Sequence, residues 1–346
     1  MELNFGRQFQ VADSHEYETG LQALEFQYNR LPAPQERAFT AVLLSPAMRT
    51  LLIFVDGLGI GTRGAHNPLD GLGDSASPLA IFTDEEPELT HGGLLARTDA
   101  CLGVEGRPQS ASGQTTILTG INAPALLGHH KQGFPNAALR EIIREHSIFL
   151  QLRRARIEPN TFANAYTPRF FHTRPRWVSA TTVAVEAAGM RFRQLEDLQN
   201  NGAVYQDFTN GLVIEAGFEV EPRTPEEAAE VLAALVAAHR FTLYEYFITD
   251  RVGHAQDMEA ALRILASLAE FVRSVLARVD LSDTTVMLTS DHGNIEDLSI
   301  RNHTRNLVPT LVWGARREQV ARRVRTLADI TPAIIESLTA REATHA

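Results

Sequence analysis

Short apolar runs alternate along the chain with segments whose apolar positions recur every three to four residues. The apolar runs are typical of buried strands and cover residues 50–56, 159–166, 241–250, 284–291 and 307–314. The helical patterns begin near 114–120 and continue over 136–155, 224–240, 257–278 and 328–339. This alternation predicts an α/β fold with a mainly parallel central sheet between helical layers.

One helix start is marked by three residues. Thr224 is expected to cap the helix, Pro225 suits its first position, and Glu227 completes a capping box. The helical assignment of 224–240 therefore has a local physical basis in addition to its periodicity.

Two intervals do not follow the alternation. Residues 1–47 are polar and interrupted by prolines, so we expect a peripheral N-terminal extension, with Met48 as an alternative natural start. Residues 48–346 then form the core. The interval of about 166–222 is expected to be a small inserted cap over one edge of the site.

Composition narrows the classes of partner. The net charge of −10 comes without a block of basic residues, so nucleic acid is not expected as a partner. No apolar run is long enough to predict a membrane span, and a lone cysteine, Cys101, excludes an intramolecular disulfide. We expect a cytoplasmic protein that acts on a small molecule; the pattern does not indicate an oligomeric state.

Gly59, Gly61 and Gly64 have the spacing of a dinucleotide-binding loop. An NAD-dependent oxidoreductase would need a helix to open within that loop. The following Asn67 and Pro68 instead favour a long loop. Asp56, which ends the strand just before the glycines, is the more informative residue.

Carboxylates and imidazoles gather where strands are expected to end. Each residue alone is typical of a turn or a helix cap. Together they would converge on one sheet edge, where carboxylates repel one another unless cations hold them, and a set without thiolates suits Zn²⁺ or Mn²⁺. The set comprises Asp56, Asp250, His254, Asp291, His292 and His303.

The sequence motifs around these residues resemble those of the alkaline phosphatase superfamily. "DRVGH", "SDHGN" and "NHTRNLVPTLVWG" are most similar to the branch of cofactor-independent phosphoglycerate mutase and phosphopentomutase, over about 48–125 and 240–340. The resemblance implies a three-layer sandwich and two divalent ions, Mn²⁺ or Zn²⁺. It implies one site made of Asp250, His254 and His303 and another made of Asp56, Asp291 and His292.

The same resemblance implies a hydroxyl nucleophile that also binds the metals. In the mutase branch it lies three residues before a glycine at a helix start, which corresponds here to Ser110 and Gly113. A helix N-terminus favours a phosphoryl dianion. Ser112, Thr115 and Thr116 remain alternatives.

This sequence differs from the mutases at two features that affect the predicted activity. Gln114 stands where the mutases have histidine, and the expected cap is small. A mutase must protect its phosphorylated intermediate from water, so a reduced cap favours a phosphomonoester hydrolase. The alternatives are a phosphomutase and a phosphodiesterase or pyrophosphatase of the same superfamily. A non-catalytic relative would be expected to have lost ligands, and this chain keeps all of them.

Substrate recognition is predicted only from loop positions. Arginine and lysine bind phosphate or carboxylate groups, and asparagine offers a neutral donor. The candidate substrate-binding residues are Arg63, Asn67, Arg107 and Lys131.

Overall fold

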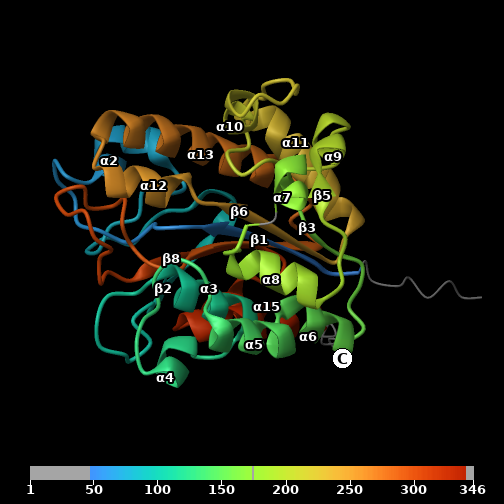
Figure 1. Cartoon of the computed structure of the whole chain (residues 1–346). Helices are drawn as coiled ribbons and strands as arrows, with labels where there is room; N and C mark the ends of the chain where they lie inside the picture. Colours follow the sequence, from blue (N-terminus) through green and yellow to red (C-terminus); the bar gives the residue numbers. More distant parts are fainter. Residues whose placement is uncertain (1–46, 174, 340–346) are drawn as a thin grey trace, which may run out of the picture. The chain divides into compact units, whose positions relative to one another are not determined.

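A six-stranded sheet forms the centre of the unit Pro46–Ala346 in the computed structural model, which describes residues 47–173 and 175–339 (Figure 1). The strand order is β2-β8-β7-β1-β6-β3. The strands are β1 (Arg49–Val55), β2 (Leu94–Thr98), β3 (Asn160–Phe162), β6 (Phe241–Tyr246), β7 (Thr284–Ser290) and β8 (Val308–Gly314). The predicted N-terminal extension over 1–47 falls almost wholly outside the described residues.

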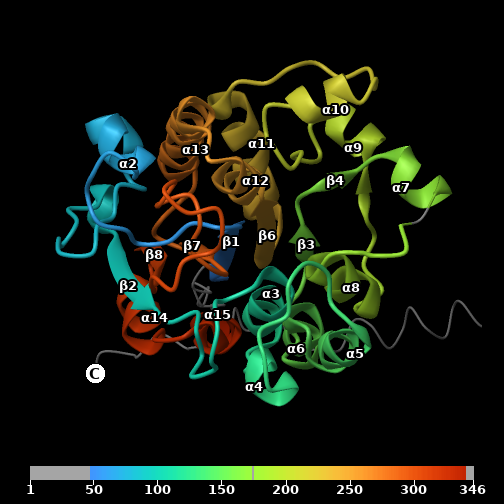
Figure 2. The same ribbon diagram turned by 60° about the vertical axis from the view of Figure 1, so that its left-hand side comes forward.

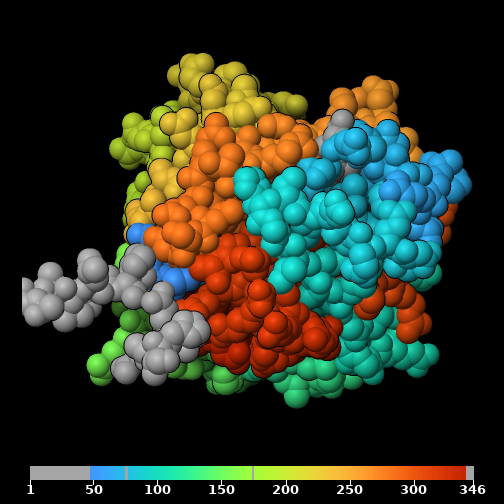
Figure 3. Space-filling view, turned by 180° about the vertical axis from the view of Figure 1, so that it is seen from behind, coloured from blue at the N-terminus to red at the C-terminus, as the bar shows by residue number. Residues whose placement is uncertain are grey.

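The sheet is mainly parallel, as the sequence predicts. Strand β1 pairs in parallel with β6 and β7, and β3 pairs in parallel with β6. Strand β8 is antiparallel to both β7 and β2, which brings distant parts of the chain together. Figure 3 shows, from behind, cyan and red segments of the chain side by side at the surface. Strand β2 lies at the sheet edge and has no counterpart among the predicted strands.

Helices cover both faces of the sheet because alternate residues of β1 enter different cores. Leu51 and Ile53 belong to one core, while Leu52 and Phe54 belong to the other. The first face carries α2 (Pro68–Leu72), α11 (Pro225–Ala238), α12 (Ile248–Ala255) and α13 (Met258–Arg278). The second carries α3 (Ser110–Thr119), α5 (Ala137–His146), α6 (Ile148–Arg154), α8 (Ala180–Ala187), α14 (Arg317–Arg323) and α15 (Ile330–Thr339). The three-layer α/β sandwich is thus confirmed.

Local signals place most helix boundaries correctly. Helix α11 begins with the predicted capping box of Thr224 and Glu227. The single helix predicted over 136–155 is instead two, because Ser147 leaves the helical backbone region at ψ 147°. The helix near 114–120 begins earlier, at Ser110.

The interval 166–222 is more varied than one inserted cap. Helix α8 packs into the main core through Val183, Ala184 and Val185. Of the other elements, those that contain Ala165, Leu198 and Val213 share a small separate core, whereas Phe170 packs against the main core. These elements appear beside β3 and β6 in Figure 2. They are β4 (Ala165–Tyr166), β5 (Arg193–Gln194), α7 (Pro168–His172), α9 (Leu195–Gln199) and α10 (Gly211–Glu215), while α4 (Ala123–Leu127) lies elsewhere, beside α3.

Across the described part of the chain, no helix combines the length and apolar character needed to cross a membrane.

Candidate metal centre

The carboxyl ends of the central strands bring the predicted acidic residues together. Asp56 follows β1 and Asp291 follows β7, two neighbouring parallel strands. Asp250 arrives differently from the prediction, because β6 ends at Tyr246 and Asp250 lies in the first turn of α12. Gly57 permits this approach: with φ +75°, a Cβ there would lie 2.9 Å from the Asp250 Cα.

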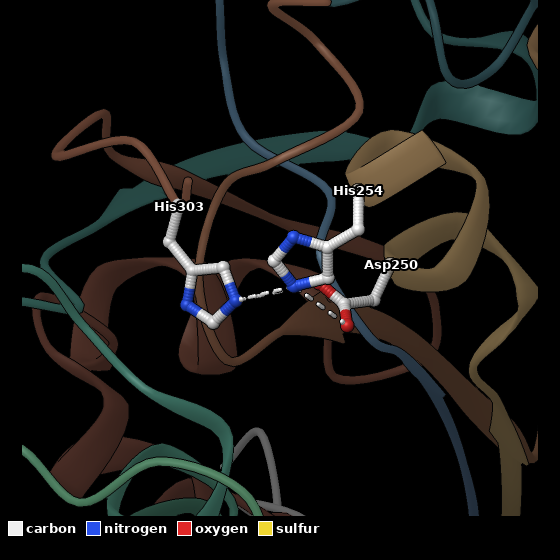
Figure 4. Close-up of side chains that lie close together, drawn as sticks. All are labelled: Asp250, His254 and His303. Carbon is white, nitrogen blue, oxygen red and sulfur yellow. Dashed lines mark hydrogen bonds and ion pairs between the residues drawn. The ribbon is translucent and has the colours of Figure 1, made fainter. Parts of the chain in front are cut away.

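Asp250, His254 and His303 form a first group of candidate ligands (Figure 4). His254 lies one helical turn after Asp250, and its Nε2 is 3.4 Å from Asp250 Oδ2. His303 enters from the loop before β8, with Nε2 3.5 Å from Asp250 Oδ1. The two imidazole Nε2 atoms are 3.1 Å apart.

Carbonyl groups determine the tautomers of these two histidines. His254 Nδ1 is 2.7 Å from the Arg301 carbonyl oxygen, and His303 Nδ1 is 2.8 Å from the Pro108 carbonyl oxygen. Because a carbonyl only accepts, each Nδ1 carries the proton in the neutral ring and each Nε2 is left with a lone pair. Burial and the neighbouring His292 lower the pKa of His303 to about 4, which keeps that ring neutral.

The first group therefore fits a cation. Two lone-pair nitrogens and a carboxylate face one point with no proton among them. A tetrahedral ion about 2.0–2.1 Å from nitrogen and oxygen ligands separates those ligands by about 3.3 Å. The Nε2–Nε2 separation of 3.1 Å is close to that value, and one ligand atom from each of the three residues lies within 4.8 Å of the others.

Asp56, Asp250 and His292 form a second group, so Asp250 belongs to both. His292 Nε2 is 3.2 Å from Asp56 Oδ1 and 3.6 Å from Asp291 Oδ2. The buried Asp56 Oδ1 has no hydrogen bond of good geometry, which also fits a missing cation. Asp291, expected as a ligand here, lies beside the group rather than among its three members.

Electrostatics in the second group reflect the crowding of its two carboxylates with the adjacent Asp291. Burial raises the pKa of Asp56 and, together with the charge of Asp56, the pKa of Asp291. Burial opposes charge on His292, but Asp291 and Asp56 outweigh it and raise the pKa of His292 to about 10. The metal-free group is thus balanced by a proton on this histidine.

Among the candidate hydroxyls, Ser110 is the one placed at the metal residues. Its Oγ is 3.1 Å from His292 Nε2 at the first position of α3. The Ser112 hydroxyl donates to the Gln109 carbonyl and accepts from the Lys131 amide. Thr115 and Thr116 donate to carbonyl oxygens one turn back within α3.

Two further residues hold candidate ligands and a third holds the loops around them, and the sequence alone did not assign these roles. The Gln114 amide donates to Asp56 at 3.1 Å and to Asp291 at 3.2 Å. The Asn294 amide donates to Asp250 Oδ1 at 2.7 Å. Glu296 is buried and accepts from two backbone amides and two side chains. The available signal was position alone, since Gln114 follows Gly113 and the other two follow His292.

Gly59, the first glycine of residues 59–64, lies against Glu296 in the loop that follows β1. A Cβ on Gly59 would lie 2.1 Å from Glu296 Oε1, and the Gly59 amide donates to Glu296 at 2.9 Å. No helix opens within the glycine run, since α2 begins only at Pro68. The alternative of a dinucleotide loop is therefore wrong.

The predicted substrate residues do not gather at the candidate metal ligands. Arg63 is bound to Asp70 and Glu85 and lies over the Phe82 ring. Asn67 is buried and caps α2. The Lys131 Nζ donates to the adjacent Gln132 carbonyl, and Arg107 is exposed.

A cavity of about 610 Å³ does open beside the candidate ligands. Asp56, Ser110 and Asp250 lie in its wall, together with Glu245 and Arg251. None of the four predicted substrate residues lines it. The wall of this cavity is therefore built from side chains other than the four predicted ones.

Known proteins resemble parts of this chain. Residues 190–342 match the family model described as the metalloenzyme superfamily. The 2,3-bisphosphoglycerate-independent phosphoglycerate mutase of Ruegeria sp. (strain TM1040) is 28% identical over 129 residues, covering 35% of this chain and 25% of the mutase. The corresponding mutase of Francisella tularensis subsp. tularensis (strain WY96-3418) is 30% identical over 133 residues, with the same two coverages. The matched region thus spans about a quarter of these relatives.

Solved structures that are similar to this chain include the alkaline phosphatase from the Antarctic bacterium TAB5. The two proteins are 12% identical, the comparison covers 84% of this chain and 98% of the phosphatase, and the TM-score is 0.45.

The family match covers the part of the chain that supplies most of the candidate ligands. Asp250, His254, His292 and His303 all lie within the matched interval. The resemblance expected from the sequence is thereby confirmed, and residues 190–342 are similar to the metalloenzyme superfamily.

Proposed function

We propose that the protein is a two-metal phosphoryl-transfer enzyme that hydrolyses phosphomonoesters through a phosphoserine intermediate. One observation carries this proposal. The Ser110 Oγ lies 3.1 Å from His292, at the edge where two groups of candidate ligands share Asp250. A nucleophile beside paired cation sites is the arrangement that in-line phosphoryl transfer uses.

Each group of residues has a separate part in this proposal. Asp250, His254 and His303 would hold one ion, and Asp56 and His292 would hold the other with Asp250 and the nearby Asp291. Two such ions supply positive charge for the phosphoryl oxygens and lower the pKa of a nearby hydroxyl. A donor set of oxygen and nitrogen without thiolate suits Mn²⁺ or Zn²⁺.

Ser110 performs the covalent step. Its oxygen loses a proton to solvent and forms a bond to phosphorus, while the ester oxygen leaves with its electron pair and takes a proton from water. Water then attacks the phosphoserine and releases inorganic phosphate. The position of Ser110 at the start of α3 directs the positive end of that helix toward the transferred group.

Hydrolysis is supported over a mutase reaction by the cavity. Arg251 is the one basic side chain among the described residues that line it. A mutase must retain an anionic intermediate for its second transfer, and this wall offers little to retain it. The mutase alternative rests on the likeness to the curated mutases. A phosphodiesterase or pyrophosphatase is the second alternative.

A test combines metal analysis with paired serine variants. The protein is loaded with Mn²⁺ or Zn²⁺, its bound metal is measured, and hydrolysis of an aryl phosphate is followed. We expect two ions per chain and activity that chelation removes. Ser110→Ala should keep both ions and lose at least about 10³-fold in kcat, because it removes the nucleophile. Ser112→Ala, two residues away, is the matched control and should keep its activity.

Mass spectrometry distinguishes the reaction types. After a rapid acid quench, phosphate on Ser110 is expected in the unaltered protein. Equal activity in the two serine variants would overturn the proposal. Conversion of 3-phosphoglycerate to its 2-isomer without net phosphate release would favour the mutase.

A further inference from the structure

Seven of the 22 residues that line the cavity beside the candidate metal ligands are aromatic. Its inner wall contains Phe162, Tyr166 and Phe170, and the ring centres of Tyr166 and Phe170 are 4.7 Å apart. The Phe162 and Tyr166 rings meet at 6.2 Å in an edge-to-face arrangement. This packing gives the wall a fixed apolar surface next to the site of phosphoryl transfer. Figure 2 shows the elements that carry part of this wall, β4, α7 and α8, with α8 beside α3.

Two further aromatic residues line the cavity while remaining open to solvent. Phe134 is 49% exposed and Trp177 is 50% exposed. Large aromatic side chains left in water next to a cavity are typical of binding sites. The guanidinium groups of Arg140 and Arg176 lie 5.7 and 5.1 Å from the Trp177 ring centre, which helps to hold that ring at the rim.

The charges of the cavity disfavour a second anionic group on the substrate. Beyond the candidate ligands, the lining contains the buried carboxyl group of Glu245 and one basic side chain, Arg251. Glu245 is an acidic group and offers no positive charge to an anion in the cavity. A phosphate held by two ions needs no further cation, whereas a second carboxylate or phosphate would meet Glu245.

We propose that this cavity receives the leaving group of a phosphate ester whose alcohol carries an aromatic ring, either a simple aryl group or a nucleoside. The inference rests on the proposed function and adds to it the class of substrate. The ring packs against Phe134 and Trp177 at the rim and the Tyr166–Phe170 wall inside. Small polyanionic substrates such as phosphoglycerate are excluded as preferred substrates.

Binding of matched phosphonates tests the inference without requiring turnover. Phenylphosphonate and methylphosphonate carry the same charged group and differ by the ring. In the Mn²⁺-loaded protein, calorimetry is expected to show phenylphosphonate binding at least about tenfold more tightly, since ring burial and stacking contribute more than 1 kcal/mol. Equal affinities would overturn the inference. So would tighter binding of 2-aminoethylphosphonate, because the aromatic residues would then serve a cation.

Tryptophan fluorescence shows whether the phenyl ring of the ligand binds beside Trp177. The chain has two tryptophans, and Trp313 is fully buried, so Trp313→Phe leaves Trp177 as the reporter. We expect phenylphosphonate, but not methylphosphonate, to change its emission. If this variant does not fold, calorimetry on Trp177→Ala and Phe134→Ala gives the answer. Each should weaken phenylphosphonate binding about five- to tenfold and leave methylphosphonate unchanged. Leu126→Ala, an exposed apolar position outside the cavity, is the control.

Hydrolysis rates then distinguish an aryl leaving group from a nucleoside leaving group. Phenyl phosphate and adenosine monophosphate are compared with glycerol phosphate by kcat/KM. Preference for either aromatic ester identifies the source, and preference for glycerol phosphate overturns the inference while the proposed hydrolase stands. Selective phenylphosphonate binding with no hydrolysis of any ester would instead overturn the proposed hydrolase and leave the aromatic pocket in place.

Discussion

The two groups of candidate ligands meet at Asp250 but distribute their protons differently. In the first group, His254 and His303 donate through Nδ1 to carbonyl oxygens and turn their bare Nε2 atoms toward each other. In the second, His292 directs Nε2 toward Asp56 and Ser110, and the charges of Asp291 and Asp56 keep a proton on it in spite of its burial.

This difference shows that the ligand types alone do not decide how a metal site behaves. The first group is electrostatically incomplete without a cation, because its lone pairs face one another. The second is complete with a proton on His292, which a metal ion must displace. We therefore expect the first group to fill more readily and with less dependence on pH.

Loss of the shared ligand should have the largest effect. Asp250→Asn keeps the size of the side chain but removes a carboxylate from both groups. We expect loss of bound metal at both sites and a fall in aryl phosphate hydrolysis of about 10³-fold or more, since both ions stabilise the same transition state. Metal analysis and initial rates measure this. Asp257→Asn, which keeps a helix-capping residue close by, should leave both values unchanged. A variant that still binds two ions would contradict the shared role.

The pH dependence of metal affinity should differ between the two groups, and this is the next largest effect. The pKa of His292 is raised to about 10, so below that pH an ion entering the second group releases one proton. Its apparent affinity should rise about tenfold per pH unit, or about 100-fold between pH 6.5 and 8.5. His303, with its pKa lowered to about 4, is already neutral over that range and adds no such dependence to the first group. Calorimetric titration of the metal-free protein at both pH values measures the two affinities. Identical pH dependence at both sites would remove the distinction.

Loss of the side-chain amides that hold the ligands should have the smallest effects on metal affinity. Each variant should affect one ion and not the other. Asn294 donates to Asp250, whereas Gln114 donates to Asp56 and Asp291. Asn294→Ala is expected to weaken the first ion by about 10–100-fold, as loss of a residue that orients a ligand usually does. Gln114→Ala should act on the second ion instead. Metal titration of both variants provides the comparison, and equal effects on both ions would show that the groups are not separable.

Much of this site follows from sequence pattern because strand ends are well marked. The apolar run of β1 leads directly to Asp56, and that of β7 leads to Asp291 and His292, so parallel pairing brings these residues together. Asp250 was placed correctly in space but on the wrong element, since the apolar pattern through Ile248 hides the end of β6.

The remaining parts depend on contacts that leave no periodic signal. Arg63 was expected near substrate, but Glu85, 22 positions later in the chain, binds it. The aromatic wall combines side chains from separate elements, such as Phe134 and Phe170, which no local pattern connects. The helix break at Ser147 also contains no proline or glycine from which it could be predicted.

Glu296 limits how this protein can change over evolution. Its two oxygens accept from the Gly59 and Asn294 amides and from the Thr304 and Asn306 side chains, so its four lone-pair positions are occupied. A change of length in the loop after β1 must therefore be matched in the loop between β7 and β8, or a buried charge loses its partners. The two loops are expected to be inherited as a single block, while the aromatic wall next to them is free to diverge and to acquire new leaving groups.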